Sequence, residues 1–127
     1  MQRSYHHGTS PYEPAYGFSR AVRVGDTIHV AGTAPVPEPG HELAIGAYMQ
    51  MLRCGEIAGR AIEALGGSLA DVVRTRMFIT NPSDADEVGR AHKGIFGKAE
   101  PAATMVVVAA LLDPGWLVEI EVEAVVR

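Results

Sequence analysis

The sequence predicts an α+β domain with the element order β-β-α-β-α-β-β, in which two helices cover one face of a sheet. Short segments that are rich in Val, or that alternate apolar and polar residues, have the length and period of strands. Two longer segments repeat apolar residues every three or four positions, as helices do, and Gly or Pro separates the segments. A length of 127 residues suits one domain with its own core. We expect an N-terminal arm over residues 1–16 and a single domain over residues 17–127.

Composition narrows the classes of function. The chain is 47% hydrophobic and 20% charged with a net charge of −4, which is typical of a soluble globular protein without the clustered Lys and Arg of a nucleic-acid interface. No apolar run approaches the roughly 20 residues of a transmembrane helix, and the polar start is not a secretory signal. Cys54 is the single cysteine, so no internal disulfide forms, and no Cys/His spacing suggests a metal site. We expect a cytoplasmic protein with no metal, nucleic-acid or membrane partner.

The first 16 residues combine turn-forming residues with three tyrosines. This composition predicts an extended arm rather than a helix or strand. Two interpretations fit it: an arm docked on the rest of the protein, or a frayed terminus.

A β-hairpin is predicted next. Residues 19–24 and 27–33 have strand character and flank Gly25-Asp26, which supplies the turn. Residues 34–44 contain three prolines and Gly40, and they predict a loop.

The first helix is predicted over about 20 residues from Ile45, ending at Gly66-Gly67. Gly55 and Gly59 lie one turn apart inside it, and each costs up to about 1 kcal/mol of helix propensity relative to Ala. We therefore expect the helix backbone to pack closely on the sheet there. Cys54 is interpreted as a small core residue rather than a nucleophile.

Residues 72–80 predict the next strand. The two-residue period puts Val73, Thr75, Met77 and Ile79 on one face and Arg74, Arg76 and Phe78 on the other. If this strand lies beside the last one, its arginines are expected to oppose Glu121 or Glu123 in an ion-pair ladder.

The second helix follows an Asn-Pro break. Ser83, with acidic residues three and four positions later, predicts its N-terminus, and Gly97 closes it after Phe96. His92 lies in its apolar stripe. Two interpretations fit this residue: a hydrogen-bonded core histidine, or a titrating group at the edge of a cleft.

Two C-terminal strands are predicted to form a hairpin. Residues 104–112 form a Val-rich run that is typical of a strand buried on both faces. Residues 113–115, Asp-Pro-Gly, predict the turn, and residues 117–124 alternate with a period of two.

That alternation places three carboxylates on one face, about 6–7 Å apart. Glu121 and Glu123 fit a solvated face. Glu119 lies beside the turn, where functional sites tend to be built. The face without helices must be wet or buried by another subunit, and its apolar positions favour an oligomer.

Several ordered segments resemble one known family, which is called the reactive-intermediate deaminase, Rid or YjgF family and was formerly described as L-PSP endoribonucleases or translation inhibitors. The resemblance covers residues 17–126 and is carried by Gly17-Phe18-Ser19-Arg20-Ala21-Val22-Arg23-Val24-Gly25-Asp26, Val30-Ala31-Gly32-Thr33-Ala34-Pro35, Leu69-Ala70-Asp71-Val72-Val73-Arg74-Thr75, Pro101-Ala102-Ala103-Thr104 and Leu117-Val118-Glu119-Ile120-Glu121. It implies a chorismate-mutase-like subunit that assembles into a homotrimer with pockets between subunits. It also implies hydrolysis of enamines or imines derived from amino acids to 2-oxo acids and ammonia, without a metal or organic cofactor.

The resemblance implies a site that this chain keeps in part. Phe18 stands where the family has a tyrosine, and Thr33 replaces the glutamine of a Gly-Gln pair. Gly89 replaces an asparagine of the second helix, and His92 follows one turn later. The acid of the last strand is kept as Glu119.

The main departure is Ala103, where active members carry an arginine that clamps the substrate carboxylate. The loss of a guanidinium fork removes two charge-assisted hydrogen bonds, so a non-standard substrate is expected. Met105 replaces a cysteine of some members and makes the pocket more apolar. Arg3, Arg20 and Arg76, or a cation of a neighbouring subunit, are candidates to replace the clamp.

Two functions follow as hypotheses. The first is a hydrolase in which Glu119 positions water or moves a proton and His92 is a second titrating group. The second is a non-catalytic trimer that binds a small hydrophobic or aromatic metabolite, with Phe18, Met105 and Trp116 as candidate apolar walls. The acidic composition argues against the older proposal of RNA cleavage.

Overall fold

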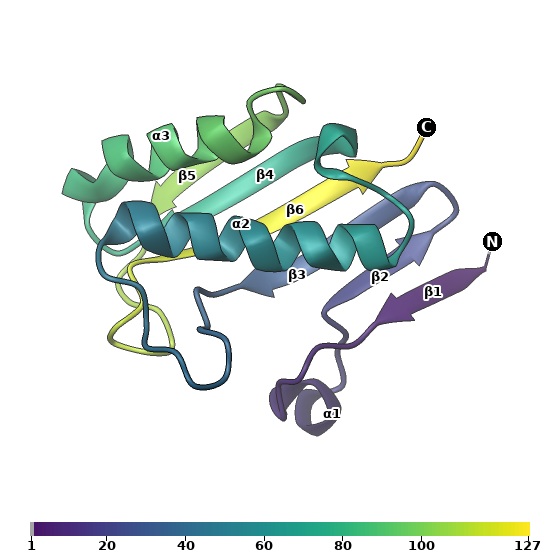
Figure 1. Cartoon of the computed structure of the whole chain (residues 1–127), viewed down its shortest axis with the longest axis horizontal. Helices are drawn as coiled ribbons and strands as arrows, with labels where there is room; N and C mark the ends of the chain where they lie inside the picture. Colours follow the sequence, from purple (N-terminus) through teal and green to yellow (C-terminus); the bar gives the residue numbers. More distant parts are fainter. Residues whose placement is uncertain (1) are drawn as a thin grey trace.

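The computed structural model describes residues 2–127 and contains one six-stranded sheet of order β1-β2-β3-β6-β4-β5. Its elements are β1 (Arg3–His6), α1 (Tyr12–Tyr16), β2 (Ala21–Val24), β3 (Thr27–Thr33), α2 (Ala47–Ala64), η1 (Leu69–Asp71), β4 (Val72–Ile79), η2 (Pro82–Asp84), α3 (Ala85–Phe96), β5 (Ala102–Val107) and β6 (Val118–Val125). Helices α2 and α3 lie side by side over the same face of the sheet (Figure 1). The predicted α+β class with two helices on one face is confirmed.

The core lies between the sheet and these two helices. In β6, the predicted alternation is confirmed: Val118, Ile120, Val122 and Ala124 are at most 1% exposed. Their partners from α2 include Met51, Cys54, Ala58 and Ile62, which are completely buried. No helix within residues 2–127 has the length and apolar character needed to cross a membrane. The opposite face of the sheet, called the open face below, has no helix over it (Figure 1).

The N-terminal segment forms two elements, so the expectation of an arm without a helix or strand is wrong. Residues 3–6 form the edge strand β1, which pairs antiparallel with β2 from Arg3 opposite Val24 to His6 opposite Ala21. Residues 12–16 form the short helix α1. The tyrosines and prolines gave no strand periodicity, and pairing with β2 supplies the order that this segment lacks by itself.

The predicted hairpin is confirmed as β2 and β3, joined at Gly25-Asp26. Gly25 has a φ of 59°, which glycine adopts without steric cost.

Helix α2 is confirmed, but its glycines pack against other elements than the sheet. A Cβ on Gly55 would lie 2.6 Å from Cδ1 of Ile95 in α3, and one on Gly59 would lie 3.4 Å from Cδ2 of Leu69 in η1. The glycines therefore allow a close approach between helices, which the spacing could not distinguish from an approach to the sheet.

The N-terminus of α3 differs from the prediction. A short 3₁₀ turn, η2, precedes the helix, and Asn81 Oδ1 accepts hydrogen bonds from the amide and the hydroxyl of Ser83 at 2.9 and 2.8 Å. Ser83 is thus a donor within this turn rather than the helix cap. The helix ends at Phe96 before Gly97, as predicted.

The prediction of a C-terminal hairpin is wrong. Strand β5 pairs with β4 in parallel, β6 pairs with β4 on its other side, and β4 therefore separates the two expected partners. Residues 108–117 connect β5 to β6, and this segment is long enough to cross the end of β4. In the single chain β5 is a mostly exposed edge strand rather than one buried on both faces.

Strand β4 contains one irregularity. The register with β6 shifts between Val72 and Arg74, and Val73 is 46% exposed, so its prediction on the face of Thr75 and Met77 is wrong. Past this bulge the alternation holds. The predicted ladder forms through Arg76, whose Nη1 lies 2.8 Å from Glu123 and 3.8 Å from Glu121.

Candidate functional site

Glu119 lies near the start of β6 on the open face. It is directly opposite Phe78 of β4, and its side chain is partly buried. Burial raises the pKa of Glu119, the nearby Arg20 charge lowers it, and the negative Glu121 adds a smaller increase. The net increase makes Glu119 a carboxyl group suited to exchanging protons nearer to neutral pH.

Gly32 makes room for the Glu119 carboxylate. A Cβ at Gly32 would lie 2.5 Å from Glu119 Oε2, which is too close for any side chain to remain there unchanged. The carbonyl oxygen of Gly32 accepts a hydrogen bond from Nη2 of Arg20. Gly32 therefore brings a carboxylate and a guanidinium to one point at the end of β3.

Arg20 is a partly buried cation with little direct pairing. Burial lowers its pKa, and the nearby Glu13 and Glu119 charges oppose that effect. Within residues 2–127, its Nε atom is buried without a hydrogen-bond partner. Such an unsatisfied buried donor is costly, and in native proteins it needs a specific explanation.

The segment that precedes β2 folds against Arg20. Both oxygens of Glu13, which is 3% exposed, accept from the amide of Gly8 at 3.1 and 3.0 Å. A Cβ at Gly8 would lie 3.6 Å from Cδ of Arg20. Phe18 lines an open pocket of about 440 Å³ together with Gly8 and Glu13. We call Phe18, Arg20, Gly32 and Glu119 the acid group of residues.

A second set of predicted site residues lies on the face that the helices cover. His92 Nε2 in α3 is 2.8 Å from the hydroxyl of Thr75 in β4, and burial lowers the pKa of His92. Ala103 of β5 is directly opposite Thr75, and Met105 follows two positions later on the same face. We call His92, Ala103 and Met105, with Gly89, the edge group.

Gly89 precedes His92 by one turn of α3. A Cβ at Gly89 would meet no atom within 4 Å, so the space beside it is open. Thr104 confirms which way β5 faces, because its hydroxyl accepts from Arg74 at 2.8 Å on the open face. Ala103 and Met105 therefore point to the other side.

The structure thus divides the predicted site residues between two faces of the sheet. Glu119 and Phe18 belong to the acid group, whereas His92, Ala103 and Met105 belong to the edge group. One chain does not bring the two groups together. Thr33 belongs to neither group, because the register shift between Val30 and Thr33 turns its side chain into the core. Thr33 is completely buried there, and its hydroxyl donates to the Ala31 carbonyl at 2.8 Å.

Arg20 was only one of three arginines that the sequence offered as a clamp. Nothing in its neighbours along the chain marks it as buried. Its place beside Glu119 depends on the pairing of β3 with β6, which aligns Thr33 with Ile120.

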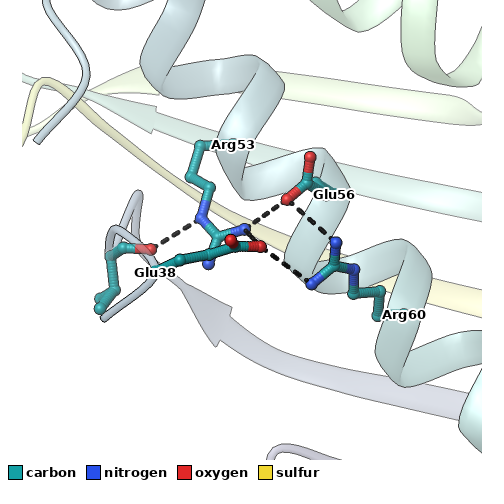
Figure 2. Close-up of polar contacts among 5 residues, drawn as sticks. Glu38, Arg53, Glu56 and Arg60 are labelled. Atoms are coloured by element: carbon teal, nitrogen blue, oxygen red, sulfur yellow. Dashed lines mark hydrogen bonds and ion pairs between the residues drawn. The ribbon is translucent and has the colours of Figure 1, made fainter. Parts of the chain in front are cut away.

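A second open cleft, of about 450 Å³, lies between α2 and the loop that precedes it. Figure 2 shows its polar wall, in which Arg53 and Arg60 alternate with Glu38 and Glu56. Arg53 Nε also donates to the Val36 carbonyl at 2.7 Å. The two positive and two negative charges balance, so this network fastens the loop to α2 and offers no unpaired charge to a ligand.

Comparison with known proteins places this geometry in a family. The family model described as Endoribonuclease L-PSP matches residues 8–126. The chain belongs to the L-PSP family. A similar member is Rv2704 from Mycobacterium tuberculosis, of the YjgF/YER057c/UK114 family, whose crystal structure has a TM-score of 0.87 and 42% sequence identity and covers 98% of this chain and 100% of that one. The chorismate-mutase-like fold implied by the resemblance is thereby confirmed.

Two further relatives of this L-PSP protein come from sequence comparison. The Streptomyces coelicolor protein SCO2049 is 38% identical over 115 residues, which cover 91% of this chain and 86% of the relative. A mouse protein named 2-iminobutanoate/2-iminopropanoate deaminase is 30% identical over 109 residues, which cover 85% of this chain and 80% of the relative. The L-PSP family therefore includes relatives named for imine deamination.

Proposed function

We propose that this protein hydrolyses the C=N bond of small imines or enamines and releases ammonia. The observation that carries the proposal is the partly buried Glu119 beside Arg20, with its pKa raised by burial. The mouse relative named as an imine deaminase supports the same reaction class.

The proposed chemistry uses one water and needs no net redox change. The Glu119 carboxylate takes a proton from the water while the water oxygen bonds to the imine carbon, and it passes this proton to the imine nitrogen to give a neutral carbinolamine. Glu119 then takes the proton of the new hydroxyl and delivers it to the amino nitrogen, the C–N bond breaks, and ammonia leaves as the C–O bond becomes a carbonyl. Imine and water thus become a ketone or 2-oxo acid and ammonia.

The division of the site between two faces supports a location between subunits. We infer that the acid group of one chain meets the edge group of a neighbour in a homotrimer. The exposed apolar side chains of β5, including Val106 and Val107 at 42% and 53%, are suited to burial by another copy.

Ala103 indicates a substrate that differs from those of typical members. Its methyl group lies opposite Thr75 and makes no charged contact. We propose that binding relies on other groups, and that the preferred imine differs in the rest of its structure from the one held by an arginine at this position.

Ammonia release from imines tests the proposal. An amino-acid oxidase generates 2-iminopropanoate, 2-iminobutanoate and longer imines in place, and the purified protein is added beside its Glu119→Gln and Ala103→Arg variants. We expect the unmodified protein to accelerate ammonia release. The rate should be at least about 100-fold lower in Glu119→Gln, because the amide cannot act as a general base. Unchanged turnover in Glu119→Gln would assign the proton transfer to another group.

The alternative is a binding protein without catalysis, and the pocket beside Phe18 favours it because that pocket also contains Pro11 and Pro14. Ammonia release by Ala103→Arg alone would indicate a hydrolytic scaffold adapted to another ligand. Saturable binding of a small apolar molecule, with no ammonia release by either form, would support the alternative.

A further inference from the structure

We propose that Arg20 holds the carboxylate of the substrate, so that the cation of the site comes from the segment before β2 rather than from β5. This inference rests on the proposed function and names its substrate class: 2-imino acids, whose carboxylate is bonded directly to the imine carbon. The substrate carboxylate and the imine carbon that water attacks are therefore neighbours. The cation that binds the carboxylate must then lie close to Glu119, which activates the water.

The position of Arg20 meets that requirement. Gly32 contacts both residues: its carbonyl accepts from Arg20 Nη2, and its missing Cβ leaves space that Glu119 Oε2 enters. A carboxylate on Arg20 thus places the adjacent carbon toward Glu119.

Arg20 also has donors to spare. A guanidinium carries five N–H donors, and the hydrogen bonds of Arg20 within residues 2–127 use one nitrogen, Nη2. Its Nε is buried without a partner in the same part of the chain. Two parallel hydrogen bonds to a carboxylate are the interaction for which this planar fork is suited.

The neighbouring carboxylates leave Arg20 available. Neither Glu13 nor Glu119 comes within the 4.0 Å of an ion pair with Arg20 in the part of the chain that the structure describes. The Glu13 carboxylate instead accepts from the Gly8 amide, and its Oε1 lies 3.5 Å from Nδ1 of His7. The nearby Glu13 and Glu119 charges raise the pKa of Arg20 against the larger lowering by burial, and a guanidinium stays protonated in proteins.

The other candidate cations fit less well. Arg76 is engaged by Glu121 and Glu123. Arg3 lies on the edge strand β1, opposite Val24 of β2 and near the Gly25-Asp26 turn. Glu119 lies at the end of β6 that is farther from this turn. Arg23 donates to the carbonyls of Gly25 and Leu65 at 2.8 and 2.7 Å. The geometry therefore selects Arg20.

Binding of a stable reaction product tests this without turnover. Titration calorimetry follows 2-oxobutanoate and its neutral amide, 2-oxobutanamide, with the unmodified protein and with Arg20→Gln, Arg20→Lys and Arg60→Gln. Arg60 on α2 is a matched control, since it loses the same charge from an exposed position outside the site. Circular dichroism and thermal unfolding check the fold of each variant.

We expect 2-oxobutanoate to bind the unmodified protein. Arg20→Gln should lower the affinity for 2-oxobutanoate by about 10- to 100-fold, because it removes charge-assisted hydrogen bonds. Arg20→Lys should lower this affinity less, because lysine keeps the charge but lacks the guanidinium fork. Arg60→Gln should bind 2-oxobutanoate as tightly as the unmodified protein does. The amide should bind weakly and with no dependence on Arg20. If Arg20→Gln does not fold, the loss in Arg20→Lys and the preference for carboxylate over amide decide the question.

Three results would overturn the assignment: no binding of 2-oxobutanoate by the unmodified protein, equal binding of acid and amide, or equal affinity in the folded Arg20 variants. The proposed hydrolysis fails separately, through absence of ammonia release. A Glu119→Gln variant that binds 2-oxobutanoate but releases no ammonia would support both the function and the role of Arg20.

Discussion

The imidazole Nε2 of His92 lies 2.8 Å from the hydroxyl of Thr75, on the face of the sheet that the helices cover. Glu119 is on β6 with its side chain toward the other face. The His92 and Glu119 of one chain therefore cannot act on the same substrate atom. His92 instead completes the hydrogen bonding of a buried hydroxyl.

The first prediction concerns His92 and pH. Burial lowers the pKa of His92 below its ordinary 6.5, so as pH falls through 6.5 the unfolded chain takes up this proton first. The free energy of unfolding should fall with pH in that range, until folded His92 is also protonated. In His92→Phe, which keeps a ring beside Phe96, this part of the pH dependence should disappear.

Urea unfolding of both proteins between about pH 7.5 and about pH 5 provides the measurement. At neutral pH, His92→Phe should lower the free energy of unfolding by about 1–2 kcal/mol, because the completely buried Thr75 hydroxyl loses its partner. Thr75→Val in the same background is the control, and it should restore part of that loss. Parallel pH curves for the two proteins would contradict the assignment.

A second prediction concerns the charge ladder on the open face. The hydrogen bond from Arg76 holds the pKa of Glu123 below its usual value, against a smaller effect of burial. In Arg76→Gln the Glu123 pKa should rise, as followed by the carbon chemical shift of its carboxylate during an NMR titration. Arg60 makes no contact with Glu123, so Arg60→Gln should leave the pKa of Glu123 unchanged. An equal shift of this pKa in both variants would argue for a general charge effect.

A third prediction concerns the contact between the helices. Gly55→Ala would place a Cβ 2.6 and 2.9 Å from the Cδ1 and Cγ2 atoms of Ile95. We expect a loss of about 1–2 kcal/mol in the free energy of unfolding, since overpacking outweighs the gain in helix propensity. Gly94→Ala in α3 is the matched control, because its Cβ would meet nothing within 4 Å, and it should gain up to about 1 kcal/mol.

Chemical denaturation of the two glycine variants provides the comparison. Ile95→Val removes the Cδ1 atom, so the penalty of Gly55→Ala should shrink in that background. A stabilising Gly55→Ala would show that Ile95 moves aside without cost.

The fourth prediction concerns Cys54. Its side chain is completely buried, and burial raises the pKa of its thiol to about 12, so the reactive thiolate is scarce in the folded protein. A thiol reagent such as dithionitrobenzoate should react very slowly near pH 8 and rapidly after unfolding. Fast labelling of the folded protein would contradict the interpretation of Cys54 as a core residue.

Most of the elements follow from residue patterns that are local in the chain. The alternation of Glu and apolar residues in β6 identified both its strand character and its buried face, because a period of two is local and survives in any sheet. The same holds for the apolar stripes of α2 and α3 and for the turn at Gly25. The ordered motifs also led to the L-PSP family, which the comparisons confirm.

The order of the strands and the contacts between distant side chains depend instead on the tertiary structure. Residues 102–107 and 118–125 are close in sequence, yet β4 lies between them, because the long connection permits β5 to pair in parallel with β4. That pairing puts Ala103 beside Thr75, and the pairing of β3 with β6 brings Arg20 and Glu119 together at Gly32. Such contacts arise from strand order and register, which depend on partners distant in the chain and leave no periodic signal at the residues themselves.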